Sequence, residues 1–263
     1  MTEISAGDVK ALRDATGAGM MDAKRALVEV DGDFDAATQL LREKGLAKAA
    51  TRSDRQNVEG AVSIATGDGR AALVHLKCET DFSAKSEGFL SLANEMAQAV
   101  LAGGETAVEA LAPALDDLRL AVKENVELGE ACLVEASGDA SLDTYLHLQD
   151  GRGVNGVIVE GRGVDQETLH QVALHVAFAK PSVLNRDDVD PDRVATERAA
   201  LLEITKAEGK PEQAWEKIVE GRLTGWFREM VLLEQGLHGD KVKVADSLNG
   251  GTIIGFTQAY LGV

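Results

Sequence analysis

The stretch AVSIATGDGRAALVHLKCETDFSAK, residues 61–85, decides the fold of this chain. Two apolar runs flank Gly67-Asp68-Gly69, and two strands around a glycine-rich turn are typical of a β-hairpin. The second run leads directly into a helical pattern that begins near residue 83. Phe82 lies at this strand-to-helix corner, among residues that prefer water. The pattern therefore raises the question of whether Phe82 packs in the core or contacts another molecule.

Two interpretations of Phe82 follow from its position. In the first, Asp81 or Ser83 caps the following helix, and Phe82, seven residues before Phe89, extends the buried face of that helix. In the second, Phe82 lies at or before the cap, where the chain has not yet taken the helical direction. A ring on a tight, capped corner loses little entropy on docking, so it is a good anchor for a partner's pocket. Spacing alone favours the first interpretation.

The segments around this stretch predict an α+β core in two halves with antiparallel sheets. The first half contains the hairpin, a long helix over about residues 83–102, a helix within 115–126 and a strand at 131–136. The long helix repeats apolar residues at helical spacing: Phe89, Ala93, Met96 and Val100. The second half contains two strands, an amphipathic helix and a last strand: 142–148, 156–161, 165–180 and 251–263. The last strand must return to pair with the earlier sheet.

Helical segments precede and interrupt this core. Residues 1–50 are predicted to form three short helices, the third of which ends at Gly45. Residues 187–236 predict two antiparallel helices, broken at Gly209-Lys210-Pro211. The second of them carries a seam of apolar residues: Trp215, Val219, Leu223, Trp226 and Met230. The predicted boundaries are 1–50 for a three-helix module, 51–57 for a linker, 58–140 for the first half of the core, 141–186 with 237–263 for the second half, and 187–236 for the inserted helical hairpin.

The charge and cysteine content exclude several classes of protein. The chain has 27 Lys and Arg against 44 Asp and Glu, a net charge of −17. Clustered cations bind a phosphate backbone, so this balance argues against direct nucleic-acid binding and favours protein partners. There is no signal-peptide pattern and no apolar run of membrane-spanning length. Cys78 and Cys132 fit no metal spacing, so we expect two free thiols in a reducing cytoplasm.

The motifs point to no self-contained active site. GRGVNG, residues 151–156, matches the pattern GxGxxG, but a strand follows it where dinucleotide binding needs a helix, so a glycine-rich loop is the better interpretation. The five histidines show no metal-binding or catalytic spacing. Cys78 follows His75 by three residues, which places the two on opposite faces of a strand. We therefore expect no enzyme, no metal and no cofactor.

Several motifs resemble the family of bacterial translation elongation factor Ts. Thr80-Asp81-Phe82 after Cys78-Glu79 is similar to the central motif of that family, and LRDATGAGMMDAKRAL, residues 12–27, to its N-terminal signature. HVAFAKP at 175–181 and GKPEQAWEKIVEGR at 209–222 resemble further family segments, so the resemblance covers nearly the whole chain. This sequence departs from the family pattern near the corner: Lys77 stands where Asn is usual, Ser83 where Val is common and His75 where an acidic residue is frequent.

The resemblance implies a guanine-nucleotide exchange factor for elongation factor Tu, without bond chemistry. It implies that Phe82, on a corner with Thr80 and Asp81, enters a pocket beside the partner's nucleotide site and causes GDP to leave. GDP, GTP and magnesium would belong to the partner. The resemblance implies further contacts from the N-terminal module and one strand: Leu12, Arg13, Met20, Met21 and His147. One of the two methionines is expected in the core of the module itself.

The resemblance also implies the nature of the helical parts. The N-terminal module resembles ubiquitin-associated domains, and the hairpin at 187–236 resembles the coiled-coil arm of the family. An alternative hypothesis is a scaffold protein built on the ubiquitin-associated-like module, without exchange activity. A thiol enzyme that uses Cys78 is a third. Contact with nucleic acid or membrane is not expected, and self-association is left open.

Overall fold

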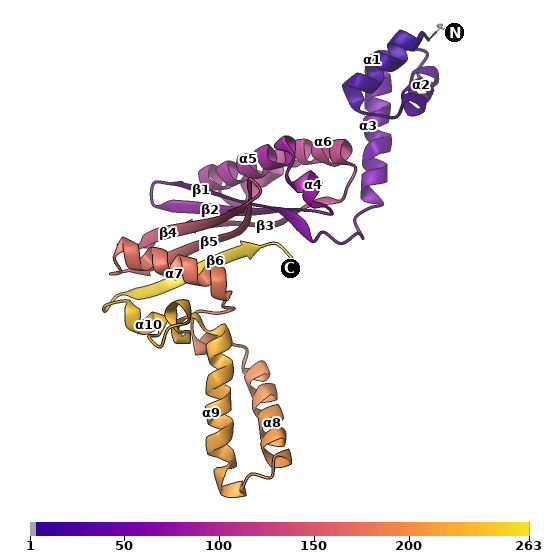
Figure 1. Cartoon of the computed structure of the whole chain (residues 1–263). Coiled ribbons are helices and arrows are strands. Elements are labelled where there is room, and N and C mark those ends of the chain that lie inside the picture. The colour runs from indigo at the N-terminus through magenta and orange to yellow at the C-terminus, as the bar shows by residue number, and fades with distance from the viewer. Residues whose placement is uncertain (1–3, 263) are drawn as a thin grey trace.

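The computed structural model describes residues 4–262 and shows an α+β fold with two three-stranded antiparallel sheets (Figure 1). The strands, in their order within each sheet, are β1 (Glu59–Gly67), β2 (Arg70–Cys78) and β3 (Val126–Glu135), then β4 (Ser141–Gln149), β5 (Arg152–Arg162) and β6 (Thr252–Tyr260). The helices are α1 (Ala6–Thr16), α2 (Met20–Glu29), α3 (Phe34–Ala50), α4 (Asp81–Ala84), α5 (Glu87–Gly103), α6 (Ala112–Val122), α7 (Gln166–Ala179), α8 (Pro191–Ala207), α9 (Glu212–Met230) and α10 (Val244–Ser247). Short 3₁₀ segments lie at Glu105–Leu111, Arg186–Asp188, Leu232–Glu234 and Leu237–Gly239. The predicted α+β class is confirmed.

The hairpin predicted at the start of the core is present as β1 and β2. Asp68 and Gly69 form its turn with positive φ angles of 52° and 72°. Two-residue turns with positive φ at both positions are favoured in hairpins, because their backbone twist matches the right-handed twist of the strands. Alternate residues of both strands face α5, whose apolar stripe from Phe89 to Val100 is buried against them. β3 completes this sheet on the other edge of β2.

The second sheet is covered by α7 on one face and packs against the first sheet on the other (Figure 1). Val62 and Leu73 of the first sheet are buried together with Ile158 of β5. At Gly153 a Cβ atom would lie 2.1 Å from the carbonyl oxygen of Val62, and at Gly156 one would lie 2.6 Å from Val62 Cγ1. These two glycines therefore allow the sheets to approach closely.

The glycine-rich loop predicted at 151–156 is wrong for most of its length. Only Gly151 belongs to a turn, where it follows Asp150 with positive φ, whereas Gly153 and Gly156 lie inside β5. The three glycines of the GxGxxG pattern therefore have structural roles: Gly151 belongs to a hairpin turn, and Gly153 and Gly156 lie where the two sheets contact each other. No helix follows it, as expected.

The three N-terminal helices pack around a small core of their own. Its buried members are Val9, Leu12, Ala23, Ala26, Leu27 and Ala37. α3 is longer than predicted, because it continues through the expected stop at Gly45 to Ala50. A Cβ at Gly45 would lie 2.4 Å from Leu120 Cδ2 of α6, so this glycine permits the close passage of two helices instead of ending one. We refer to residues 6–50 as the N-terminal module.

The helices α8 and α9 lie side by side and extend away from the sheets (Figure 1). The turn between them contains Gly209 with a φ of 70°. Val219, Leu223 and Met230 of the predicted seam are buried, whereas Trp215 and Trp226 are only partly buried and Phe227 takes an inner position instead. Among residues 4–262, no helix is long and apolar enough to cross a membrane.

Candidate functional site

Phe82 projects from the strand-to-helix corner and is 84% exposed. The interpretation that it extends the buried face of the following helix is wrong, because the predicted long helix is broken. α4 ends at Ala84, and α5 begins at Glu87 after Ser86, which occupies the N-cap position. The spacing of seven residues from Phe82 to Phe89 therefore does not run along one helix, and only Phe89 is buried.

The corner is capped by Thr80, not by Asp81 or Ser83 as the sequence predicted. The Thr80 hydroxyl oxygen accepts a hydrogen bond from the backbone N–H of Ser83 at 3.3 Å. The thiol of Cys78 also donates to the carbonyl oxygen of Thr80 at 3.2 Å. Both contacts fix the chain on the N-terminal side of Phe82.

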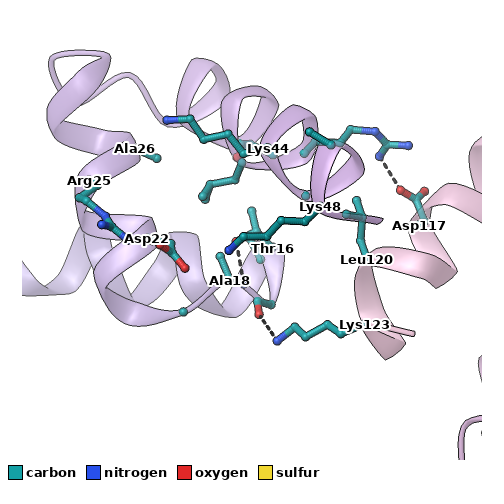
Figure 2. Close-up of a pocket in the computed structure, with 18 of the residues that line it drawn as sticks. Thr16, Ala18, Asp22, Arg25, Ala26, Lys44, Lys48, Asp117, Leu120 and Lys123 are labelled. Carbon is teal, nitrogen blue, oxygen red and sulfur yellow. Dashed lines mark hydrogen bonds and ion pairs between the residues drawn. The ribbon is translucent and has the colours of Figure 1, made fainter. Parts of the chain in front are cut away.

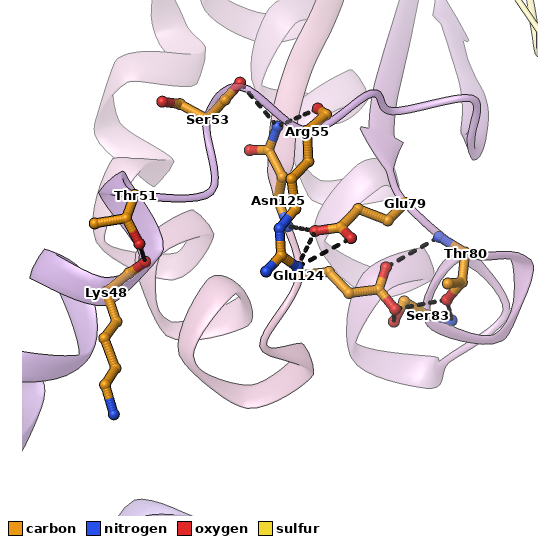
Figure 3. Close-up of polar contacts among 9 residues, drawn as sticks. All are labelled: Lys48, Thr51, Ser53, Arg55, Glu79, Thr80, Ser83, Glu124 and Asn125. Atoms are coloured by element: carbon orange, nitrogen blue, oxygen red, sulfur yellow. Dashed lines mark hydrogen bonds and ion pairs between the residues drawn. The ribbon is translucent and has the colours of Figure 1, made fainter.

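A carboxylate from a distant part of the chain holds the same corner (Figure 3). Glu124, between α6 and β3, accepts the Thr80 N–H at 3.0 Å through Oε2 and the Thr80 hydroxyl at 2.6 Å through Oε1. The hydroxyl of Ser83 donates to Oε1 at 2.7 Å. No local sequence pattern points to Glu124, because its partners lie more than forty residues away along the chain.

The neighbouring Glu79 ties the corner to the linker. Its Oε1 accepts the backbone N–H of Asn125 at 2.7 Å, and Nη1 of Arg55 lies 3.2 Å from both carboxylate oxygens (Figure 3). The side-chain amide of Asn125 donates in turn to the carbonyl oxygen of Arg55 at 3.1 Å. Glu124 and Asn125, which lie between α6 and β3, therefore hold the segment that carries Phe82 from two sides.

Lys85 connects the corner electrostatically to the second sheet. Its Nζ lies 2.8 Å from Oδ2 of Asp81 and 3.1 Å from Oδ2 of Asp150 in the β4–β5 turn. The hydrogen bond from Lys85 holds the pKa of Asp81 below its usual value, and the carboxylates of Asp81 and then Asp150 raise the pKa of Lys85. Asp81 is therefore a charged part of the corner whose partner is Lys85.

His147 is exposed on β4, one of the two edge strands of the second sheet. Its Nδ1 lies 3.0 Å from the hydroxyl of Tyr145, and the two rings stack at 6.2 Å. Its cross-strand neighbour Asn155 donates to the carbonyl oxygen of Ala177 at 2.8 Å, which brings the end of α7 close. Phe178, 79% exposed at that end, was missed. It falls outside the stripe formed by the buried residues of α7, and that pattern could have revealed it.

The predicted contacts of the N-terminal module divide into surface and core. Arg13 is exposed beside Asp14, and Met20 and Met21 are 46% and 64% exposed. The expectation that one methionine is buried is therefore wrong. Leu12 is fully buried between the helices, so it supports the shape of the module and offers no surface for a partner.

The module meets α6 across a cleft of about 1140 Å³ (Figure 2). Six cationic and three acidic residues line it: Arg25, Arg42, Lys44, Lys48, Arg52 and Lys123, with Asp22, Glu29 and Asp117. Arg42 pairs with Asp117 at 2.5 Å, and Lys123 Nζ lies 3.4 Å from the carbonyl oxygen of Gly17. These contacts seat the module beside the end of α6 that precedes Glu124.

The thiols and acidic groups give no support to the hypothesis of a thiol enzyme. Cys78 is buried under α5, and burial raises its pKa to about 12, so it is a thiol at neutral pH and a poor nucleophile. The Cys78 thiol donates to the carbonyl oxygen of Thr80, and Nε2 of the buried His75 has no hydrogen-bond partner among the described residues. Within the described part of the chain, no group of three or more His, Cys, Asp and Glu residues is placed to hold a metal ion.

The fold and the site together define an α+β protein whose candidate site is a projecting aromatic corner on a hydrogen-bonded frame. The family model described as Elongation factor TS matches residues 79–262. Curated proteins named Elongation factor Ts are similar over the whole chain: that of Clavibacter michiganensis subsp. michiganensis is 43% identical and covers 100% of both chains, and that of Cutibacterium acnes is 44% identical over 95% of each. The protein from Mycobacterium tuberculosis strain H37Ra is 40% identical over 100% of this chain and 99% of its own. The chain belongs to the elongation factor Ts family.

Proposed function

We propose that this chain promotes the release of GDP from elongation factor Tu and holds the nucleotide-free partner until GTP binds. Family membership supports the partner and the exchange role. The observation that carries the proposal is the exposure of Phe82 on a corner where the hydroxyls of Thr80 and Ser83 bond to Glu124 and the carboxylate of Asp81 pairs with Lys85. A ring held in this way is already in position to dock.

In the proposed mechanism, Phe82 enters the partner beside its nucleotide and magnesium site, and Thr80 and Asp81 keep the corner in shape. No bond is made or broken, and GDP, GTP and magnesium belong to the partner. By linkage, a factor that binds the nucleotide-free partner more tightly than the GDP-bound form must weaken GDP binding by the same factor. The proposed place of action is the cytoplasm, where translation takes place.

The free energy needed shows that Phe82 cannot act alone. To accelerate release about a thousandfold requires about 4 kcal/mol of differential stabilisation, whereas burial of one Phe side chain supplies roughly 1.5–3 kcal/mol. Further contacts are proposed for exposed residues of the module and for one strand residue: Arg13, Met20, Met21 and His147. We further propose that the module is ubiquitin-associated-like and that α8 and α9 act as an arm that reaches another face of the partner.

The test is the release of labelled GDP from purified elongation factor Tu, with the affinity of the complex measured in parallel. Phe82→Ala should lower the maximal release rate by at least about tenfold, because the loss of an aromatic anchor exceeds 1.4 kcal/mol. Binding should remain, since the other contacts are intact. Val242→Ala is the control, because Val242 is an exposed apolar residue to which no partner contact is assigned.

Two outcomes would contradict this proposal. If the wild-type chain leaves GDP release unchanged, the protein is a scaffold and no exchange factor. If wild-type stimulates release and Phe82→Ala does so equally well, the exchange role stands but Phe82 is not its agent.

A further inference from the structure

Within residues 4–262, the Glu124 carboxylate makes its hydrogen bonds to the two residues that flank the Asp81-Phe82 pair. Oε2 accepts the backbone N–H of Thr80, and Oε1 accepts the hydroxyls of Thr80 and Ser83. Because the Thr80 hydroxyl donates its proton to Glu124, its lone pairs are turned toward the N–H of Ser83, which is the capping bond of α4. One carboxylate thus sets both the position of the cap and its rotamer.

The corner needs this external support. α4 contains only four residues, and a single turn of helix has no stability of its own, because nucleation fixes several dihedral angles for one hydrogen bond. Hydrogen bonds to a charged acceptor are shorter and stronger than neutral ones. The carboxylate therefore supplies order that the local sequence of α4 does not.

The backbone of Glu124 is itself firmly placed. Lys123 ends α6 in the left-handed conformation with a φ of 60°, and Asn125 is buried and bonded to Glu79 and to the linker. Lys123 also contacts the carbonyl oxygen of Gly17 in the N-terminal module. A carboxylate between two fixed neighbours can hold the corner without moving with it.

We propose that Glu124 is the positioning residue of the exchange site: it holds the Phe82 corner in the conformation that docks and does not itself touch the partner. This inference rests on the proposed function. Without Glu124, the corner samples other conformations, so the competent form is a smaller fraction and each docking event must order it. The N–H of Thr80 and the two hydroxyls then turn to water.

The experiment is a double-mutant cycle on GDP release at saturating factor, with Glu124→Gln, Phe82→Ala and the double variant. Glutamine keeps the size of the side chain but replaces one acceptor oxygen with an NH₂ group. If this group faces the Thr80 N–H, two donors oppose each other. If it faces the hydroxyls of Thr80 and Ser83, they lose the oxygen to which they donate. Glu124→Gln should lower the maximal rate by about tenfold, while the affinity of the complex changes by less than about threefold. In the Phe82→Ala background the same change should cost less than about twofold, because no ring remains to be positioned.

A matched control is Glu127→Gln, which removes the same charge three residues away on the exposed side of β3, and it should release GDP at the wild-type rate. Hydrogen exchange of the amides of residues 80–85 in the isolated chain supplies a readout without the partner. Exchange should be faster in Glu124→Gln and unchanged in Glu127→Gln. If Glu124→Gln does not fold, Ser83→Ala removes one of the carboxylate's hydrogen bonds from the other side, leaves the Thr80 cap in place and enters the cycle instead.

Equal losses from Glu124→Gln in the two backgrounds would overturn the inference and assign Glu124 a general structural role. Wild-type rates in Glu124→Gln, or unchanged hydrogen exchange at the corner, would overturn it as well. These results leave the proposed function intact as long as the wild-type chain stimulates release. A wild-type chain that fails to stimulate release removes both.

Discussion

Single polar side chains in this protein differ sharply in whether they find a partner. At the Phe82 corner the polar groups of Thr80, Ser83 and Glu124 are bonded to one another. His75 on β2 is only 4% exposed, and its Nε2 has no hydrogen-bond partner among the described residues. The pKa of His75 is lowered from 6.5 to about 4, mainly by burial and to a smaller extent by the charge of Lys77. A neutral imidazole in the fold is therefore a source of acid sensitivity.

His75 should destabilise the fold as the pH falls. Its folded pKa is below its unfolded value, so the unfolded chain binds the proton more tightly and stability is lost between pH 6.5 and about 4, by about 3 kcal/mol in all. His75→Leu should remove this loss, so that its free energy of unfolding, relative to wild type, improves steadily as the pH is lowered through that window. Urea unfolding at pH 7, 5.5 and 4.5 measures the difference.

The groups that face His75 make the comparison with the variant necessary. Glu130 lies opposite His75 on β3, and burial raises the pKa of Glu130. Protonation of Glu130 as the pH falls therefore stabilises the fold, which opposes the effect of His75. Parallel pH profiles of wild type and His75→Leu would show that the imidazole contributes nothing.

At the scale of elements, the apolar periodicity predicts where helices lie better than where they end. The stripe from Phe89 to Val100 is buried as predicted, but the helix that carries it starts after a break at Lys85-Ser86. Gly45 does not end α3, because the proximity of Leu120 gives that glycine another role. Both errors involve contacts between segments far apart in the sequence, and a local pattern does not contain them.

The pairing of α8 and α9 provides a prediction at this scale. Leu223 is buried among Val189, Phe227, Met230 and Val231, so Leu223→Ala should leave a cavity and cost about 2–5 kcal/mol in the local stability of the two helices. Ile204→Ala on α8 is the matched control, because Ile204 is half exposed and should cost less than about 1 kcal/mol. Native-state hydrogen exchange of α8 and α9 amides measures both. Equal protection in the two variants would show that Leu223 is not a packing residue.

At the scale of the whole molecule, the contact between the two sheets depends on the absence of side chains on β5. Gly153 and Gly156 face the first sheet at distances that no Cβ tolerates. The same strand places Asp150 at its turn beside Lys85, so the packing of the sheets also places the Phe82 corner relative to His147. The candidate surface is therefore assembled from both halves of the core.

Gly153→Ala should push the sheets apart, because the atom in the way is the backbone oxygen of Val62 and not a flexible side chain. We expect a loss of at least about 1–3 kcal/mol in the free energy of unfolding. Gly255→Ala in β6 makes the same chemical change in the same sheet, with nothing within 4 Å of the new atom, and should shift stability by less than about 1 kcal/mol. Thermal and urea unfolding compare the two, and similar losses would disprove the close-approach argument.

The sequence by itself determined the α+β class, the hairpin at Gly67-Asp68-Gly69, the buried stripe of α5 and the family resemblance, because each depends on short motifs or on periodic patterns among residues that are neighbours in the sequence. Only the tertiary structure decided that Phe82 points outward while Leu12 is buried, that Gly45 and Gly153 serve close packing, and that Glu124 holds the corner. The direction of a side chain, the atoms close to it and its hydrogen-bond partners depend on which distant segments the folded chain brings together. The pattern of a single stretch of sequence does not contain this information.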